Sequence, residues 1–311
     1  MEPTYKFDQL KVIYFGTPEV SIFGLKALID DERFKVLAVV TQPPKPVGRK
    51  QVITKSPIHD FADEHKIQVL TPVKARDAMG ELTGFDADLH IVVAYGQILP
   101  NDLVESPYYG TLNIHPSLLP RWRGAAPVPA TILSGDKEAG VCIMLMDDKM
   151  DHGPVLDVQK VVVGGKTTDE LLPELMKLGA DRLPDIANEW AKERMTPKPQ
   201  DHDLATFSKM MSRDDAKIDL AAPIEQIERM IRAYDPWPGT WIEAEIDGTW
   251  KRVKILKAHI GGEDADMTLK TSSNETSIAT LTIDSLQIEG KKPISGEEFA
   301  KTHKNQTWNI K

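Results

Sequence analysis

Short apolar runs alternate with segments of helical periodicity through the first half of the chain. Strands are predicted at 11–15, 36–41, 68–70, 89–94 and 111–114, and helices between them at 20–29, 58–65 and 74–82. The change between a helical period and a short apolar run is the signal that separates the two kinds of element. Their alternation is typical of a doubly wound, mainly parallel sheet with helices on its faces.

The pattern continues beyond Gly124 with a helix expected at 125–133 and a pair of strands at 141–146 and 155–163. The register of that pair is left open by the pattern. A polar cap at 167–170 then precedes leucines at helical spacing, which predicts a long helix reaching about residue 193 with a break near Pro184.

The segment 195–205 is the best candidate for a linker, because it holds two prolines and little apolar content. It predicts a catalytic domain at 1–194, a linker at 195–205 and a second domain at 206–311. In the second domain a helix at 223–234 is followed by short strands, at 241–246, 250–260, 267–270 and 277–288. One helix with several short strands fits a small OB-like β-barrel.

Composition supports a globular protein with two domains. Of 311 residues, 41% are hydrophobic and 27% are charged, and no apolar stretch is long enough to span a bilayer. The start of the chain mixes acidic and basic residues and lacks the plan of a signal or transit peptide, so we expect a cytoplasmic protein. We also expect a monomer. Cys142 is the only cysteine and lies in an apolar run, which predicts a buried, inert thiol.

The net charge of −9 argues against generic nucleic-acid binding by a basic surface. Any contact with RNA must therefore be local. The richest candidate is the stretch 42–55, which carries four cations and no acid: Lys45, Arg49, Lys50 and Lys55.

Candidate chemistry lies at the end of the fifth predicted strand. Asn113 and His115 share one face of that strand by alternation, at the place where open α/β sheets present their ligand sites. An amide and an imidazole side by side suit acyl transfer, since both can donate to an oxyanion and neutral histidine can move a proton. Asp151, in a polar turn ending in glycine, could orient His115.

The string NIHPSLLPRWRGAAP at 113–127, with MDDKMDHGPVL at 146–156, closely resembles the signature of folate-dependent formyltransferases. Further strings extend the resemblance over almost the whole chain: FGTP at 15–18, TQP at 41–43, AYGQILP at 94–100 and DPWPGTW at 235–241. Together they are similar to the methionyl-tRNA formyltransferase family. The resemblance implies a formyltransferase-type, Rossmann-like domain followed by an OB-like barrel that contacts tRNA.

The resemblance also implies roles for individual residues. Asn113, His115 and Asp151 match the catalytic Asn, His and Asp of the family. The segment Ser117, Leu118, Leu119 and Pro120 matches its folate-contacting loop, and the backbone of Ala94, Tyr95, Gly96, Gln97 and Ile98 is expected to line the pterin pocket. The implied co-substrate is 10-formyltetrahydrofolate, without a metal.

The resemblance further implies that the acceptor is initiator methionyl-tRNA, and that the reaction produces N-formylmethionyl-tRNA for translation initiation. Arg49 matches the key arginine of the basic loop with which the family reaches the acceptor arm. Lys45, Lys50 and Lys55 accompany it.

Other functions are weighed against this one. Relatives that formylate amino sugars, or that hydrolyse formyltetrahydrofolate, share the core, but the basic loop argues against them. A non-enzymatic RNA-binding module is disfavoured because residues 206–311 hold 15 Lys or Arg and 17 Asp or Glu, a net of −2. A dehydrogenase is disfavoured because no GxGxxG follows the first strand. Trp237 and Trp241 are interpreted as core and turn residues rather than as platforms for RNA bases.

Overall fold

The computed structural model describes residues 9–48, 50–261, 268–269 and 280–302. The chain divides into two compact units. Unit 1 comprises Met1–Gly124, Glu138–Val162 and Leu172–Phe207. Unit 2 comprises Ala125–Lys137, Val163–Leu171 and Ser208–Lys311. Two internal segments that the sequence analysis gave to the first domain therefore belong to the second unit.

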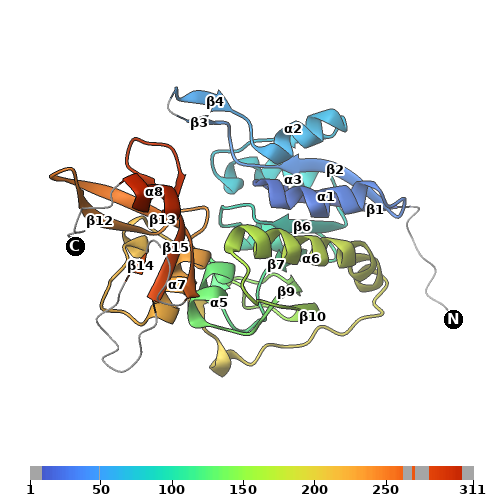
Figure 1. The fold of residues 1–311 in the computed structure, drawn as a ribbon. Helices are drawn as coiled ribbons and strands as arrows, with labels where there is room; N and C mark the ends of the chain where they lie inside the picture. The colour runs from blue at the N-terminus through green and yellow to red at the C-terminus, as the bar shows by residue number, and fades with distance from the viewer. Residues whose placement is uncertain (1–8, 49, 262–267, 270–279, 303–311) are drawn as a thin grey trace. The chain divides into compact units, whose positions relative to one another are not determined.

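Unit 1 is built on one seven-stranded sheet in the order β10-β9-β7-β6-β1-β2-β5 (Figure 1). Five of its strands are parallel, as predicted: β1 (Leu10–Gly16), β2 (Phe34–Val40), β5 (Gln68–Leu70), β6 (Leu89–Val93) and β7 (Thr111–His115). The pair whose register was open, β9 (Glu138–Leu145) and β10 (Val155–Val162), is antiparallel, and β9 is also antiparallel to β7.

Helical segments cover both faces of this sheet. They are η1 (Glu19–Ser21), α1 (Ile22–Ile29), α2 (Pro57–Glu64), η2 (Ala75–Ala78), α3 (Met79–Gly84), α4 (Asn101–Val104) and α6 (Thr168–Ala191). Side chains alternate along β1, so Ile13 and Phe15 join a core cluster with residues of η2, α3 and α4. Tyr14 points to the opposite face, where its hydroxyl donates to Ser21 O at 2.7 Å. The prediction of a doubly wound sheet is confirmed.

Helix α6 runs unbroken through Pro173 and Pro184, so the expected break is wrong. A proline inside a helix removes one hydrogen bond and crowds the preceding turn. Burial of Leu175, Leu183 and Ala187, whose side chains are fully covered, opposes that cost. The helix also approaches the sheet closely, since a Cβ at Gly179 would lie 2.8 Å from side-chain atoms of β7 and β9.

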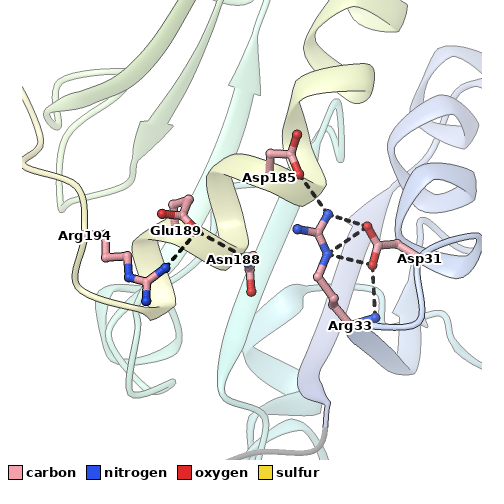
Figure 2. A network of polar contacts seen from close by, with 6 residues as sticks. All are labelled: Asp31, Arg33, Asp185, Asn188, Glu189 and Arg194. Atoms are coloured by element: carbon pink, nitrogen blue, oxygen red, sulfur yellow. Dashed lines mark hydrogen bonds and ion pairs between the residues drawn. The ribbon is translucent and has the colours of Figure 1, made fainter. Parts of the chain in front are cut away.

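A polar network ties the outer surface of α6 to the turn before β2 (Figure 2). The Arg33 guanidinium donates to Asp31, at 2.5 Å at its shortest, and to Asp185 of α6 at 2.9 Å. Further along the helix, Glu189 faces Arg194. These charged groups are partly exposed, with the Asp31 side chain the most covered, at 20% exposed, so each pair contributes little stability, on the order of 1 kcal/mol or less.

The basic stretch is a hairpin rather than an irregular loop. Strands β3 (Lys45–Val47) and β4 (Val52–Thr54) pair antiparallel, with Val47 opposite Val52. Three-residue strands with a proline inside give almost no periodic signal, which is why the pattern predicted a loop. Val47, Val52 and Ile53 are all exposed on this hairpin.

Unit 2 contains a five-stranded antiparallel sheet in its described residues, in the order β12-β13-β15-β14 with β16 beside β15. Its elements are α5 (Pro127–Ser134), η4 (Asp214–Ala216), α7 (Ile224–Ala233), β12 (Trp241–Ile246), β13 (Thr249–Gly261), β14 (Thr268–Leu269), β15 (Thr280–Ile288), β16 (Ile294–Ser295) and α8 (Gly296–Thr302). Buried isoleucines of α7 face the sheet and form one core with it. The antiparallel domain is confirmed, whereas closure into a barrel stays a prediction.

The chain passes between the units near two short strands, β8 (Arg123–Gly124) and β11 (Phe207–Ser208). The segment expected to be a linker is bonded to unit 1: the backbones of Lys198 and Val155 exchange two hydrogen bonds of 2.8 Å, and η3 (His202–Leu204) follows. None of the helices described in the structure has the length and apolar character needed to cross a membrane.

Candidate active site

The predicted site residues lie around the ends of neighbouring strands of the unit 1 sheet. The turn at 94–98 follows β6, and Asn113 and His115 end β7, the strand between β6 and β9. Asp151 comes from the loop between β9 and β10. Because parallel strands end at one edge, the turn at 94–98 and His115 meet there. The Asp151 loop instead leaves β9, which is antiparallel to β7, beside the amino end of β7.

His115 is held at both ring nitrogens. Its Nε2 lies 3.1 Å from Trp122 O. A carbonyl oxygen can only accept, so Nε2 carries a proton in this arrangement. Its Nδ1 lies 3.5 Å from Asp151 Oδ1, and the imidazole is almost completely buried. The histidine is therefore oriented by a carbonyl on one side and a carboxylate on the other.

Asp151 is placed by its own backbone and by Gly124. The Gly124 N–H donates to Asp151 Oδ2 at 2.7 Å, which leaves Oδ1 facing the imidazole. Asp151 has a φ of 49°, in the left-handed region that a residue other than glycine occupies at a cost of about 1–3 kcal/mol. The loop also lies against the end of β9, because a Cβ at Gly153 would stand 2.1 Å from Leu145 O. Only glycine fits at that position.

Asn113 lies two residues before His115 on β7 and is half-buried. Among the residues that the structure describes, no hydrogen bond or ion pair engages its side-chain amide. The amide can therefore donate to a bound molecule without first breaking a bond within the protein. The structure brings His115 and Asp151 into contact, with Asn113 on the same strand as the histidine.

The segment Ser117 to Pro120 follows β7 directly and is anchored at its first residue. The Ser117 N–H donates to His115 O at 2.9 Å, and the Cys142 thiol donates to Ser117 O at 3.0 Å. Burial raises the pKa of this thiol to about 12, so the thiol stays protonated and unreactive. The Ser117 hydroxyl is buried and has no hydrogen-bond partner within the described residues. Leu118, Leu119 and Pro120 are half-buried.

The turn at 94–98 is fixed by side chains from two other strand ends. Thr17 donates to Tyr95 O at 2.7 Å, and Gln42 donates to Tyr95 O and Gly96 O, both at 3.1 Å. The Tyr95 ring lies in the core, where burial raises its pKa to about 12. Ala94 and Gly96 both have positive φ values, and Ile98 is exposed. The backbone of this turn, rather than its aromatic side chain, is thus presented at the sheet edge.

The cations predicted to contact RNA differ in their surroundings. The Lys45 ammonium donates to Gln42 Oε1. Lys55 pairs with Asp63 at 2.5 Å, and that hydrogen bond raises the pKa of Lys55. Lys50 is exposed at the hairpin turn, and no ion pair engages it in the described part of the chain. Arg49 lies outside the described residues.

Sequence reasoning missed two buried residues behind the Asp151 loop. Gln200 is 8% exposed and Arg123 3% exposed, and each bonds to the other through side-chain atoms. Gln200 lies in a proline-rich segment whose composition indicated a linker, so no local signal pointed to it. Arg123 lies within the motif at 113–127, but nothing in its local sequence indicates this contact.

Unit 2 has a cavity of about 300 Å³ that combines aromatic and cationic side chains. Trp237 is 50% exposed at this cavity, whereas Trp241 is buried and has the Arg252 guanidinium 3.9 Å above its ring. The cavity is lined by Arg213, Trp237, Pro238, Trp241, Arg252, Lys254, Gln287, Ile288, Glu289 and Gly290. Trp241 thus fits the core interpretation, while Trp237 faces a cavity with three cations and one acid.

Metal-ligating side chains are not clustered in the part of the chain that the structure describes: no group of three or more His, Cys, Asp or Glu there is arranged to hold an ion.

Comparison with known proteins identifies both parts of the chain. Residues 10–185 match the formyl transferase family model, and residues 210–304 match that of the formyl transferase C-terminal domain. The methionyl-tRNA formyltransferase of Roseiflexus sp. (strain RS-1) is 40% identical over 93% of this chain and 91% of its own length. The methionyl-tRNA formyltransferase of Brucella anthropi is 37% identical over 93% of this chain and 97% of its own length. The structure of WlaRD, a sugar 3N-formyl transferase determined with dTDP and 5-N-formyl-THF, superposes with a TM-score of 0.61 at 18% sequence identity. The match covers 91% of this chain and 99% of WlaRD.

Proposed function

Because this chain belongs to the methionyl-tRNA formyltransferase family, we propose that it transfers the formyl group of 10-formyltetrahydrofolate to the α-amino group of initiator methionyl-tRNA. The product is N-formylmethionyl-tRNA, which serves translation initiation. The observation that carries the proposal is the buried His115, paired with the half-buried Asp151, on the same strand as an unengaged Asn113 amide. That strand ends at the edge where open α/β sheets bind ligands. We further infer that the enzyme is cytoplasmic and acts as a monomer.

Formyl transfer requires charge stabilisation on one oxygen and the movement of one proton. The methionyl nitrogen attacks the formyl carbon, and negative charge grows on the formyl oxygen in the tetrahedral intermediate. Asn113 donates a hydrogen bond to that oxygen, and His115 donates a second one when its Nε2–H exchanges Trp122 O for the formyl oxygen. A preorganised site stabilises the charge more than water does. The intermediate collapses when the bond to folate N10 breaks, and the proton lost by the amine reaches N10 through the site.

Asp151 supports this chemistry through His115. The carboxylate oxygen lies 3.5 Å from Nδ1 and holds the ring in one orientation. Gly124 in turn holds the carboxylate, so its position does not depend on the histidine alone. His115 and Asp151 thus act as one unit, and Asn113 supplies the second donor.

Residues 94–98 and 117–120 are the proposed folate-binding segments: Ala94, Tyr95, Gly96, Gln97 and Ile98, with Ser117, Leu118, Leu119 and Pro120. Both follow parallel strands at the edge that carries His115. The turn at 94–98 is held by Thr17 and Gln42, so its backbone is preorganised for a flat ring. The buried Ser117 hydroxyl has unused hydrogen-bonding capacity in the described structure, which fits a polar ligand group.

The proposed contacts with tRNA come from two local features in an acidic protein. The first is the β3–β4 hairpin, which carries Lys45, Arg49, Lys50 and Lys55 together with exposed apolar side chains. Of the cations that the structure describes, Lys50 is best placed for phosphate, because it is exposed and no ion pair there engages it, whereas Lys45 bonds to Gln42 and Lys55 to Asp63. The second is the cavity of unit 2, where the Trp237 ring could stack on an unpaired base while Arg213 and Lys254 meet phosphate.

We predict that Asn113→Ala, His115→Ala and Asp151→Ala each lower kcat for methionyl-tRNA formylation by at least about a hundredfold. One preorganised donor in the transition state is worth roughly 3 kcal/mol. Single-turnover kinetics with saturating 10-formyltetrahydrofolate measures the loss, and circular dichroism checks the fold. A variant that melts normally and keeps near-normal turnover removes its residue from the catalytic set.

We predict that Lys50→Ala weakens methionyl-tRNA binding and lowers the slope of log affinity against log salt by about one, because one phosphate contact is lost. Lys26→Ala is the matched control, since Lys26 is an exposed lysine on α1 away from the hairpin. The measurement is a salt series of tRNA affinity, with a folate titration in parallel. Identical slopes for Lys50→Ala and wild type would show that the hairpin is only a solvated surface.

We predict that Trp237→Ala lowers methionyl-tRNA affinity by about fivefold to 150-fold, as expected if stacking on one base contributes about 1–3 kcal/mol. Folate binding is expected to stay unchanged. Trp250→Ala is the matched control, because Trp250 is 41% exposed in the same unit but does not line the cavity. Equal losses in both variants, or none in Trp237→Ala, would contradict an RNA contact at the cavity.

A further inference from the structure

Gln200 bonds to the backbone on both sides of His152 in the loop that carries Asp151. Its Nε2 donates to Asp151 O at 2.9 Å and to Gly153 O at 2.7 Å. Its Oε1 accepts two hydrogen bonds from the Arg123 guanidinium, at 2.7 and 3.2 Å. A carboxamide has two donor hydrogens and two acceptor lone pairs, so the side chain is used to its full capacity.

The Gln200 side chain cannot exchange these bonds for water, because both it and Arg123 are buried. Its backbone is placed by the neighbouring exchange of hydrogen bonds between Lys198 and Val155, the first residue of β10. The amide is therefore supported from the strand that leads out of the Asp151 loop. A buried amide with this support fixes the two carbonyl groups that it contacts.

Arg123 and Gly124 connect this contact to the catalytic carboxylate. The Gly124 N–H holds the Asp151 side chain, while the Arg123 guanidinium holds the amide that binds the Asp151 backbone. Two adjacent residues thus hold Asp151, one at its side chain and one, through Gln200, at its backbone. This support matters because Asp151 has the left-handed φ of 49°, a conformation that an unsupported loop would tend to leave.

Two histidines, His152 and His202, lie next to the contact between Gln200 and the Asp151 loop. Arg123 also donates to His202 Nδ1 at 2.9 Å, so that nitrogen is unprotonated. The His202 ring stacks on His152 with the centroids 3.9 Å apart, and His152 Nδ1 lies 2.6 Å from Asp147 Oδ2. The loop is thereby attached to the segment 200–202 by a stacked ring pair as well as by the amide.

We propose that Gln200 is a positioning residue for the reaction: it acts through Asp151 by holding the backbone that sets this carboxylate against His115. The proposal rests on the proposed formyl transfer. Gln200 does not touch the reacting atoms in this account, and its effect passes entirely through the Asp151 loop. Misplacement of a catalytic group by about 1 Å can cost about a hundredfold in rate.

Gln200→Glu is the sharpest variant. It keeps the size of the side chain and the acceptors for Arg123, but it removes both donors and turns an oxygen toward two carbonyl groups. We expect kcat per folded molecule to fall about tenfold to a hundredfold, with KM for folate and for methionyl-tRNA within about twofold of wild type. Gln200→Asn, which keeps the amide but is too short to reach both carbonyls, is expected to lose activity in the same way.

Gln9→Glu is the matched control. Gln9 also donates through its amide to two backbone carbonyls, Glu32 O at 2.9 Å and Phe34 O at 3.4 Å, but it lies before β1, at the opposite end of that strand from the site. The same change of charge and the same loss of donors there are expected to leave kcat unchanged.

A double-mutant cycle with Asp151→Asn separates positioning from general structural support. If Gln200 acts through Asp151, Gln200→Glu costs little once Asp151 is already replaced, so the two effects are strongly non-additive. Additive effects would overturn the proposal. An unchanged kcat per folded molecule would also overturn the proposal. The same holds if neither Gln200 variant is folded at temperatures at which the wild type is folded, since either result assigns only a structural role to Gln200.

Wild-type turnover in the same assay reports separately on the proposed function. If the wild type formylates a different acceptor, the proposed substrate is wrong, and the cycle is measured with the acceptor that is used. The ratio between variant and wild type then still decides the role of Gln200.

Discussion

The Asp151 carboxylate is the point on which the arrangement of the site depends. It faces His115 from a backbone in the left-handed region, and Gly124 fixes the oxygen that does not face the imidazole. The loop can lie there because residue 153 is glycine, in contact with the end of β9. A local backbone cost is thus opposed by hydrogen bonds from residues distant in the chain, which is how strained conformations persist at functional sites.

In the proposed account, formyl transfer and folate binding belong to unit 1, whereas contacts with tRNA come from both units. Every residue assigned to formyl transfer and to folate lies in unit 1, at the end of β7, in the segments that follow β6 and β7, or in the loop between β9 and β10. Unit 2 carries no candidate catalytic group in this account, but its cavity brings an exposed tryptophan together with three cations. In a chain with a net charge of −9, such local features are the means by which an acidic enzyme can bind a polyanion.

Much of the fold could be predicted, because buried parallel strands leave short apolar runs between helical segments. The positions of Asn113, His115 and Asp151 could also be predicted, because the first two end a strand, Asp151 lies in a turn, and all three lie in a recognisable family motif. The break near Pro184 was wrong because burial of the α6 face outweighs the local cost of proline. Gln200 could not be found, because its bonds join residues 49 and 47 positions apart and leave no local pattern.

The central claim is that this site formylates methionine carried on tRNA rather than an amino sugar or water. Its most direct test offers the wild-type protein 10-formyltetrahydrofolate with charged initiator methionyl-tRNA, free methionine, an amino-sugar nucleotide or no acceptor, and follows formyl transfer to each. We expect formylmethionyl-tRNA to form rapidly and the other reactions to stay near background. Preferential formylation of the amino sugar, or hydrolysis of the folate without transfer to methionyl-tRNA, would contradict the account.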